Sequence, residues 1–324
     1  MSIALGNATG EAGVVVRDLR VDYGRRIAVN RLNLEIGRGE IFGLLGPNGA
    51  GKTTTFRVMA TLQEPTHGEI FLAGSDARRN PEQARASLAY MPDLAPLPVD
   101  LRAEEFLKYF AECHGLTGSA RDARVDECLE AVDLMDRRRD FCPKLSLGMR
   151  QRLALACCLL HRPRVLILDE PASGMDPVAR AALRAALKRE AASGTTIVLS
   201  SHVLSELQDL CTSIGLLQEG RLLDSGPLRD VLQRQGNRTR RLRFRTIGSV
   251  SDLIQWLASP AGLRDCEPHV IHHEVECNFS GDDAEQAAFF QRIGASGLGI
   301  VAMREVETSI EDVVLGLRRN GDNQ

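Results

Sequence analysis

The chain contains very little lysine, few aromatic residues and no long apolar run. Of its 40 lysine and arginine residues only four are lysine, and aromatic residues make up 4% of the 324 positions. No apolar stretch approaches the roughly 18 residues that a membrane-spanning helix requires. Any function at a membrane would therefore depend on a separate partner.

The charge balance and the cysteine spacing exclude further classes of protein. The 40 basic residues are matched by 43 acidic ones, for a net charge of -3, so no broad positive field would attract nucleic acid. The eight cysteines show no C-x-x-C spacing, which argues against a zinc site or a disulfide framework and indicates reduced thiols in a cytosolic protein. With 44% hydrophobic residues, the chain can form one large or two moderate globular domains.

The order of the apolar patterns predicts an α/β fold followed by a second, smaller domain. Residues 1–13 are small and polar and predict a flexible tail. Strand patterns open the first domain, 14–234, a helical segment follows at about 95–160, and strands and helices alternate thereafter. The composition changes near residue 238, and the pattern of a C-terminal accessory domain, 238–324, predicts a small α+β unit of βαββαβ order.

Three features of the C-terminal domain leave its role open. Arginines cluster between residues 238 and 245, where a linker entering a strand with a solvated basic face is favoured over a patch for anionic lipid or a partner. His269, His272 and His273 lie on a predicted hairpin without an acidic or thiol ligand, so a structural role is favoured over metal binding. An amphipathic helix is predicted at 309–318.

The segment GPNGAGKT, Gly46 to Thr53, carries the phosphate-loop pattern G-x-x-x-x-G-K-[ST] between a predicted buried strand and a predicted helix. Its glycines let the backbone curl so that successive N–H groups face a phosphate. Lys52 would reach the β- and γ-phosphates, and Thr53 would offer its hydroxyl to Mg²⁺. An ordinary glycine turn is disfavoured, because Lys52 is one of only four lysines.

Two later apolar strands end in polar residues that would complete a nucleotide site. VLILDE brings Asp169, placed to hold Mg²⁺ through water, and Glu170, placed to act as general base for an attacking water. TTIVLSSH ends in His202. A lone histidine is more often structural, but a parallel sheet would bring His202 to the same edge, where it could contact the γ-phosphate.

The stretch KLSLGMRQR begins a second helix suited to phosphate. Ser146 is a good N-cap, and Gly148 adds a bare backbone amide in the first turn. A single nucleotide needs only one such helix start, so the residues alone leave open what the second one is for.

Together these motifs resemble those of the ATP-binding cassette (ABC) ATPases over residues 14 to about 234. The resemblance implies a P-loop, RecA-like fold with a helical subdomain. It identifies Tyr23 as the aromatic residue that stacks on adenine, Asp169 and Glu170 as Walker B, Asp176 as the D-loop aspartate and His202 as the switch histidine. The residues matching Walker A are Gly46, Pro47, Asn48, Gly49, Ala50, Gly51, Lys52, Thr53 and Thr54, and those matching the signature sequence are Ser146, Leu147, Gly148 and Met149.

The chain departs from the family's usual motifs at three positions. Leu147 and Met149 replace a glycine and the glutamine of LSGGQ, while Ser146 and Gly148 remain. Asp93 stands where the Q-loop glutamine is usual. A carboxylate cannot donate a hydrogen bond as an amide does, although it could still hold Mg²⁺ through water.

The resemblance also implies an assembly. In this family two cassettes pair head to tail, and the signature helix of one closes on the ATP held by the other. We therefore expect ATP and Mg²⁺ as cofactors, a second ABC ATPase subunit in a homodimer or heterodimer, and a separate transmembrane permease docking near Asp93 to Phe110. No nucleic-acid partner is expected.

The signature form and the predicted 309–318 helix resemble those of ATPase subunits of bacterial type-two exporters, the multidrug and antibiotic kind. The resemblance thus implies an ATP-hydrolysing motor at the cytoplasmic face of the inner membrane. Three alternatives remain: a soluble ABC ATPase of DNA repair or translation, a nucleotide-sensing module without turnover, and an importer ATPase.

Overall fold

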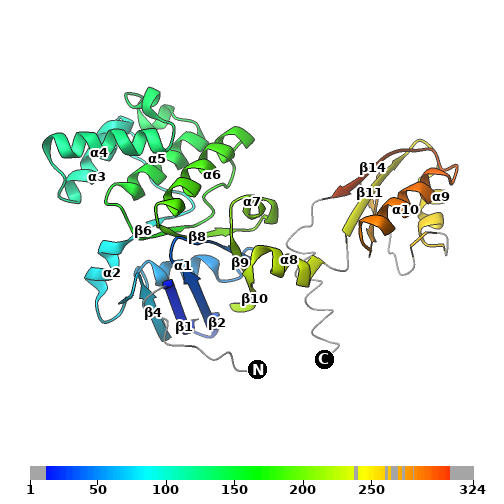
Figure 1. Cartoon of the computed structure of the whole chain (residues 1–324), viewed down its shortest axis with the longest axis horizontal. Helices are drawn as coiled ribbons and strands as arrows, with labels where there is room; N and C mark the ends of the chain where they lie inside the picture. The colour runs from blue at the N-terminus through cyan, green and yellow to red at the C-terminus, as the bar shows by residue number, and fades with distance from the viewer. Residues whose placement is uncertain are drawn as a thin grey trace. The chain divides into compact units, whose positions relative to one another are not determined.

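A computed structural model describes residues 12–236, 240–259, 262–263, 269–271, 274–279 and 281–306. The chain divides into two compact units, Met1–Leu228 and Arg229–Gln324, so the division falls at the start of helix α8 (Leu228–Gly236). The domain boundary between 234 and 238 stays a sequence prediction. Figure 1 shows the elements of each unit.

The first unit opens with a four-stranded antiparallel sheet. Its strand order is β2-β1-β4-β5, from β1 (Ala12–Tyr23), β2 (Arg26–Gly37), β4 (His67–Leu72) and β5 (Ser75–Asp76). The predicted tail, 1–13, extends two residues too far towards the C-terminus, because β1 begins at Ala12. Sheet pairing overrides the small, polar composition there: Ala12 pairs with Gly37, and the carbonyl of Gly13 accepts a hydrogen bond from the amide of Ala73 at 2.8 Å.

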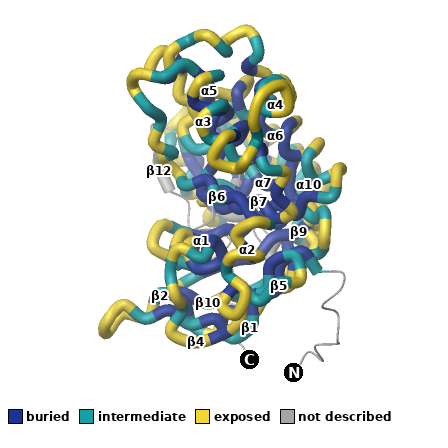
Figure 2. The backbone as a smooth tube through the Cα atoms, turned by 90° about the vertical axis from the view of Figure 1, so that its left-hand side faces the viewer, coloured by how far each residue is buried: buried dark blue, intermediate teal, exposed yellow. Residues whose placement is uncertain are grey.

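A six-stranded sheet forms the centre of the same unit, in the order β10-β9-β3-β8-β7-β6. The parallel strands are β3 (Ile41–Leu45), β6 (Leu88–Met91), β7 (Val165–Leu168), β8 (Thr196–Ser201) and β9 (Ser213–Gln218), and β10 (Arg221–Pro227) pairs antiparallel to β9. These strands are short, almost fully buried and mostly apolar, as expected of a parallel sheet covered on both faces. Figure 2 shows β6, β7 and β9 as buried.

The register of the parallel strands determines which strand ends meet. Leu45 of β3 pairs with Ser201 of β8, and Leu168 of β7 pairs with Leu199 of β8. The residues that follow these strands therefore emerge together at the carboxyl edge of the sheet, where open α/β sheets bind ligands.

The helices of the first unit surround the sheet and build the helical segment. Helix α1 (Lys52–Met59) follows β3 directly, and α2 (Pro81–Ser87), α6 (Pro177–Ala192) and α7 (Leu204–Gln208) connect other strands. The helical segment contains α3 (Ala103–Cys113), α4 (Gly118–Ala131), α5 (Leu147–Leu159) and the 3₁₀ turns Met135–Arg137 and Cys142–Lys144. These helices fall within 95–160, the range for which the sequence predicts a helical subdomain, and the subdomain itself remains a prediction.

The second unit has the predicted βαββαβ order. It runs β11 (Arg240–Thr246), α9 (Val250–Leu257), β12 (His269–Ile271), β13 (Glu274–Phe279), α10 (Asp283–Gly294) and β14 (Ile300–Val306), with sheet order β12-β13-β11-β14. Phe244 and Phe289 are fully buried and lie edge to face with ring centroids 6.0 Å apart. Both helices pack their apolar faces into this core.

The structure also bears on the open features of the C-terminal unit. Arg243 forms ion pairs with Glu274 and Glu276, so part of the arginine cluster is neutralised within the sheet. Within the described ranges, no group of three histidine, cysteine or acidic residues is arranged to hold a metal ion. His272, His273 and the predicted helix 309–318 lie outside the described residues. No helix in the described part of the chain is long and apolar enough to cross a membrane.

Candidate functional site

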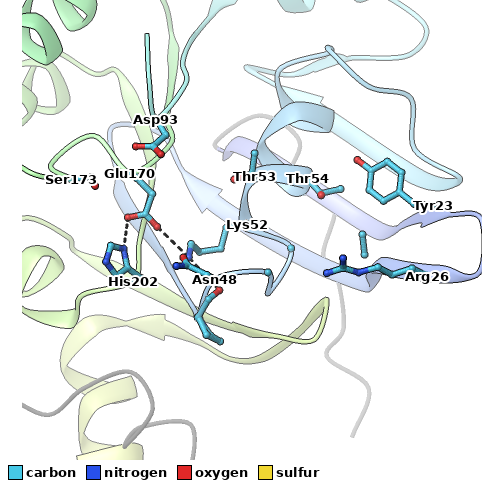
Figure 3. Close-up of a pocket in the computed structure, with 14 residues that line it drawn as sticks. Tyr23, Arg26, Asn48, Lys52, Thr53, Thr54, Asp93, Glu170, Ser173 and His202 are labelled. Atoms are coloured by element: carbon cyan, nitrogen blue, oxygen red, sulfur yellow. Dashed lines mark hydrogen bonds and ion pairs between the residues drawn. The ribbon is translucent and has the colours of Figure 1, made fainter.

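A pocket of about 370 Å³ opens at the carboxyl edge of the central sheet (Figure 3). It is lined by Tyr23, Arg26, Ala28, Pro47, Asn48, Gly49, Gly51, Lys52, Thr53, Thr54, Asp93, Glu170, Ser173 and His202. The structure thus brings together four groups that the sequence predicts to be functional: the phosphate loop, the acid after β7, the histidine after β8 and Asp93 after β6. These residues come from four different strand ends, as the parallel register requires.

The phosphate loop places the start of α1 in this pocket. Gly51, the N-cap of α1, has φ +107°, and a Cβ there would lie 2.5 Å from the carbonyl oxygen of Ala28, so the position requires glycine. Because glycine has no side chain with which to cap the helix, the first N–H groups of α1 are left to an external acceptor. An anion at this point is stabilised by those N–H groups and by the helix dipole.

Lys52, Glu170 and His202 form a continuous polar chain across the pocket (Figure 3). The Nζ of Lys52 donates to the carbonyl of Gly46 at 2.6 Å and lies 3.2 Å from Oε1 of Glu170. The other carboxylate oxygen, Oε2, lies 2.8 Å from Nδ1 of His202. Lys52 is only 6% exposed, so its charge needs partners, and a phosphate would compete with Glu170 for it.

Asp169 lies behind the pocket, where it supports Glu170. It is 2% exposed, and Ser200 donates to its Oδ1 at 2.6 Å. The same hydroxyl of Ser200 accepts the backbone N–H of Glu170 at 2.8 Å. Glu170 itself has φ +48°, a left-handed conformation that costs a non-glycine residue about 1 to 2 kcal/mol. Ser200 therefore helps to hold a strained backbone that points the Glu170 carboxylate into the pocket.

Asp93 adds a further negative charge to the pocket. Burial raises the pKa of its carboxyl group, and the negative charges of Glu170 and Asp169 raise it further, against a lowering by His202. The negative charges of Glu170 and Asp169 therefore both oppose ionisation of Asp93. A cation bound with the nucleotide would offset these charges.

Several predicted residues lie outside the pocket lining. Gly46, Ala50 and Asp169 support the pocket from behind, with Ala50 3% exposed and the amide of Gly46 donating to the carbonyl of Ser201 at 3.4 Å. Asp176 is the N-cap of α6, where its carboxylate accepts the amide of Ala179 at 2.9 Å. None of the four signature residues, Ser146, Leu147, Gly148 and Met149, lines the pocket.

The signature residues form a separate helix start on α5. Ser146 is exposed and its hydroxyl accepts the amide of Met149 at 3.3 Å, which confirms it as the N-cap. Leu147 is 46% exposed. Gly148 is buried, and a Cβ there would lie 2.7 Å from the Cβ of Ala179, so this glycine is also required for packing against α6.

The sequence reasoning missed three lining residues, Arg26, Ala28 and Ser173. Arg26 begins β2 three residues after Tyr23, which is 47% exposed and whose hydroxyl donates to Gln63 at 2.6 Å. An arginine three residues after a predicted adenine-stacking residue was a usable signal. Ser173 follows the Walker B acid in the turn before Asp176, but nothing in its pattern distinguished it.

Comparisons with known proteins match this geometry. A family model described as ABC transporter matches residues 29–173, and a model of an AAA domain matches residues 142–207. The chain is 37% identical over 228 residues to the "Probable multidrug ABC transporter ATP-binding protein YbhF" of Escherichia coli strain K12, and this match covers 70% of the chain but only 39% of that protein.

Two further comparisons cover most of their counterparts. The chain is 32% identical over 305 residues to the "Bacitracin transport ATP-binding protein BcrA" of Bacillus licheniformis, covering 94% of the chain and 96% of that protein. A solved structure described as "Structure of ATP binding subunit of ABC transporter" is 33% identical with a TM-score of 0.62, covering 69% of the chain and 93% of that structure.

Proposed function

The chain belongs to the ABC transporter family of ATP-binding proteins, and from this premise we propose that it hydrolyses ATP as the motor subunit of a bacterial exporter. The observation that carries the proposal is the pocket in which Lys52, Glu170 and His202 face one another at the start of α1. This arrangement combines a phosphate-binding cation, a carboxylate base and a second phosphate contact.

In the proposed mode of binding, the triphosphate lies along the phosphate loop. The backbone from Pro47 to Thr54 would surround the phosphates, and Lys52 would pair with the β- and γ-phosphates. The exposed ring of Tyr23 stands at the rim of the pocket and would stack on adenine. Arg26, on the same side, adds a positive charge for the phosphates or the sugar.

The pocket suits Mg²⁺, which supplies charge neutralisation at the transferring phosphoryl group when it is bound. Thr53 and Asp93 line the pocket with oxygen donors, and Asp169 lies just behind it. These oxygens alone are too few for a complete ligand set, in keeping with the use of substrate phosphates as additional ligands. A cation here would offset the negative charges of Glu170 and Asp169, which oppose ionisation of Asp93.

For hydrolysis, Glu170 is the proposed base. A γ-phosphate would draw Lys52 away from Oε1 of Glu170, which would free this oxygen to orient and deprotonate the attacking water. His202 would keep its contact with Oε2 or turn to the γ-phosphate. Lys52 would stabilise the negative charge that spreads over the transferring group.

A second copy of the chain is the proposed partner for the signature helix. Ser146 is exposed at a phosphate-ready helix start, yet neither it nor its neighbours line the pocket of their own chain. A head-to-tail dimer would place each α5 start against the nucleotide of the other copy. ATP would then act as the clamp between two copies, and hydrolysis would release them.

A separate membrane subunit is the proposed receiver of this movement. Between Asp93 and Phe110, the large apolar side chains Leu94, Val99 and Tyr109 are 77%, 79% and 58% exposed. A patch of exposed apolar side chains marks a protein contact, and we propose that these three belong to the docking surface for the membrane subunit. The relatives with transport names support an exporter at the inner membrane over soluble repair or translation ATPases and over an importer.

The substitution Glu170→Gln tests the assignment of the base. The variant keeps the size and the hydrogen-bonding shape of the side chain but removes its basicity. We expect it to bind ATP, to accumulate as an ATP-bound dimer on gel filtration, and to hydrolyse ATP at least about 100-fold more slowly. Hydrolysis at the parent rate would reject Glu170 as the base.

A further inference from the structure

Gln151 is a buried polar side chain in the second turn of α5, outside the nucleotide pocket. It is 4% exposed, and its Nε2 donates to the backbone carbonyl of Asp93 at 2.7 Å. This bond joins two segments that are 58 residues apart in the chain. It connects the helix that begins at Ser146 with the loop that carries Asp93 into the pocket.

The other half of the Gln151 amide has an unfavourable environment. Its Oε1 is buried and has no hydrogen-bond partner among the described residues. A buried acceptor without a partner costs free energy, whereas an apolar side chain of the same size would avoid that cost. The amide of Gln151 therefore contributes little net stability to the fold. Its one hydrogen bond is better explained by the position in which it holds the Asp93 backbone.

The next residue, Arg152, links α5 to the end of α4. Its Nη1 donates to the carbonyls of Val132 and Asp133 at 3.0 and 3.1 Å, just after the end of α4. Helix α5 is therefore fixed to α4, and a displacement of α5 would carry the helical segment with it. Gln151 is the side chain through which such a displacement would reach the Asp93 loop.

We propose that Gln151 is a positioning residue that couples the signature helix to the nucleotide pocket of the same chain. It does so by holding the Asp93 backbone, so that the position of α5 determines where the Asp93 carboxylate lies relative to Glu170 and the bound nucleotide. This inference rests on the proposed function, in which the partner's nucleotide engages the start of α5 at Ser146. Closure on one nucleotide would then adjust the other pocket, and the two sites would hydrolyse ATP cooperatively.

The test compares ATP hydrolysis by the full-length parent with that of Gln151→Met and Gln151→Glu over a range of ATP concentrations. Methionine fills a similar volume without polar atoms, and an ionised glutamate keeps the shape but cannot donate. We expect kcat to fall about tenfold in both, because a misplaced group near the reacting centre is costly, and the Hill coefficient to fall towards 1. The affinity for a fluorescent ADP analogue should stay within about twofold.

Thermal stability distinguishes the positioning role from a purely structural one. The thermal midpoint of Gln151→Met should stay close to that of the parent, because the substitution removes both the unpaired Oε1 and the bond to the carbonyl of Asp93, two changes with opposite effects on stability. The matched control is Gln83→Met, the same chemical change at an exposed position of α2, which should leave every quantity unchanged. A lower thermal midpoint with unchanged kcat in the folded fraction would overturn the positioning role.

A double-mutant cycle tests whether Gln151 acts through Asp93. If it does, Gln151→Met should change kcat less than about twofold in an Asp93→Ala background. Additive losses would overturn the inference.

The Ser146→Arg variant separates this inference from the proposed function. Parent-rate hydrolysis by Ser146→Arg would overturn both. An inactive Ser146→Arg together with parent kcat and cooperativity in Gln151→Met would overturn the positioning role alone.

Discussion

Helices α1 and α5 both begin with features that suit a phosphate, yet they differ in how their first turns are satisfied. Helix α1 starts after Gly51, which has no capping side chain, and the pocket of its own chain lies in front of it. Helix α5 starts after Ser146, whose hydroxyl already accepts the amide of Met149. The first helix start is open to a ligand within the chain, and the second is internally capped and exposed.

This difference explains how one chain can contain two phosphate-ready helices. The N–H groups of α1 have a buried lysine beside them and can bind the nucleotide tightly. At α5, the hydroxyl of Ser146 already accepts one of the first N–H groups. A phosphate there would bind to a helix start that is already capped. We interpret α1 as the primary nucleotide site and α5 as the contact offered to a second copy.

The largest effect should come from removing the cation at α1. Lys52→Ala deletes a charge that is 6% exposed and removes the lysine that contacts Oε1 of Glu170. We expect the affinity for ATP to fall about 100-fold or more, as is typical when one member of a buried charge pair is truncated. Isothermal titration calorimetry measures this directly, and retained tight binding would remove the basis for treating α1 as the primary site.

A change at α5 should separate binding from turnover. Ser146→Arg removes the cap and places a long side chain at an exposed helix start. We expect ATP to bind with parent affinity, because Ser146 does not line the pocket, while hydrolysis falls about 100-fold or more through blocked closure. If this variant lost ATP binding and hydrolysis together, α5 would not be functionally distinct from α1.

A smaller effect is expected from Gly148→Ala. The new methyl group would lie 2.7 Å from the Cβ of Ala179, so α5 and α6 must separate slightly. We expect a loss of about 1 to 3 kcal/mol in the free energy of unfolding, together with weaker hydrolysis. Gly294→Ala is the matched control, since a Cβ at that helical position meets no atom within 4 Å, and it should be neutral or stabilising. Equal effects of the two substitutions would contradict the packing role of Gly148.

The smallest expected effect is a pH dependence of the free energy of unfolding, which arises near the C-terminal end of α5. His114 stacks on His161 with ring centroids 4.3 Å apart, and burial followed by the neighbouring His161 lowers the pKa of His114 below its ordinary value of 6.5. As the pH falls below about 6.5, the unfolded chain therefore takes up the proton first, and stability is lost until the lower pKa of the folded state is passed. Urea denaturation at pH 8 and pH 5.5 should show this loss, and His114→Phe should reduce it. An unchanged pH dependence in that variant would exclude His114 as the source.

Much of the fold could be predicted from the sequence, because local patterns determine it. The strand ending at Gly46, the helix beginning at Lys52 and the βαββαβ order of the C-terminal unit follow from hydrophobic period and glycine placement. The composition of residues 1–13 indicated a tail, but it did not reveal that Ala12 pairs with Gly37. Such pairing depends on a distant strand, which no local pattern records.

The candidate site could be predicted as a set of residues but not as a network. Lys52, Glu170 and His202 each follow a recognisable strand or motif. Their mutual contacts, and the support that Ser200 gives to Asp169 and Glu170, arise only when neighbouring strands come into register. Gln151 was missed for the same reason, since its bond to Asp93 spans 58 residues.

The central claim is that α5 completes the nucleotide site of a second copy. Its most direct test mixes Lys52→Ala chains with Ser146→Arg chains, each of which should be inactive alone. In an equal mixture half of the dimers would contain both chains, and each of these would have one complete site, formed by the intact Lys52 of one chain and the intact Ser146 of the other. Independent sites would restore hydrolysis to about a quarter of the parent rate, and we predict a recovery up to this level, with coupling between the sites lowering it. A mixture no more active than either variant alone would contradict the account.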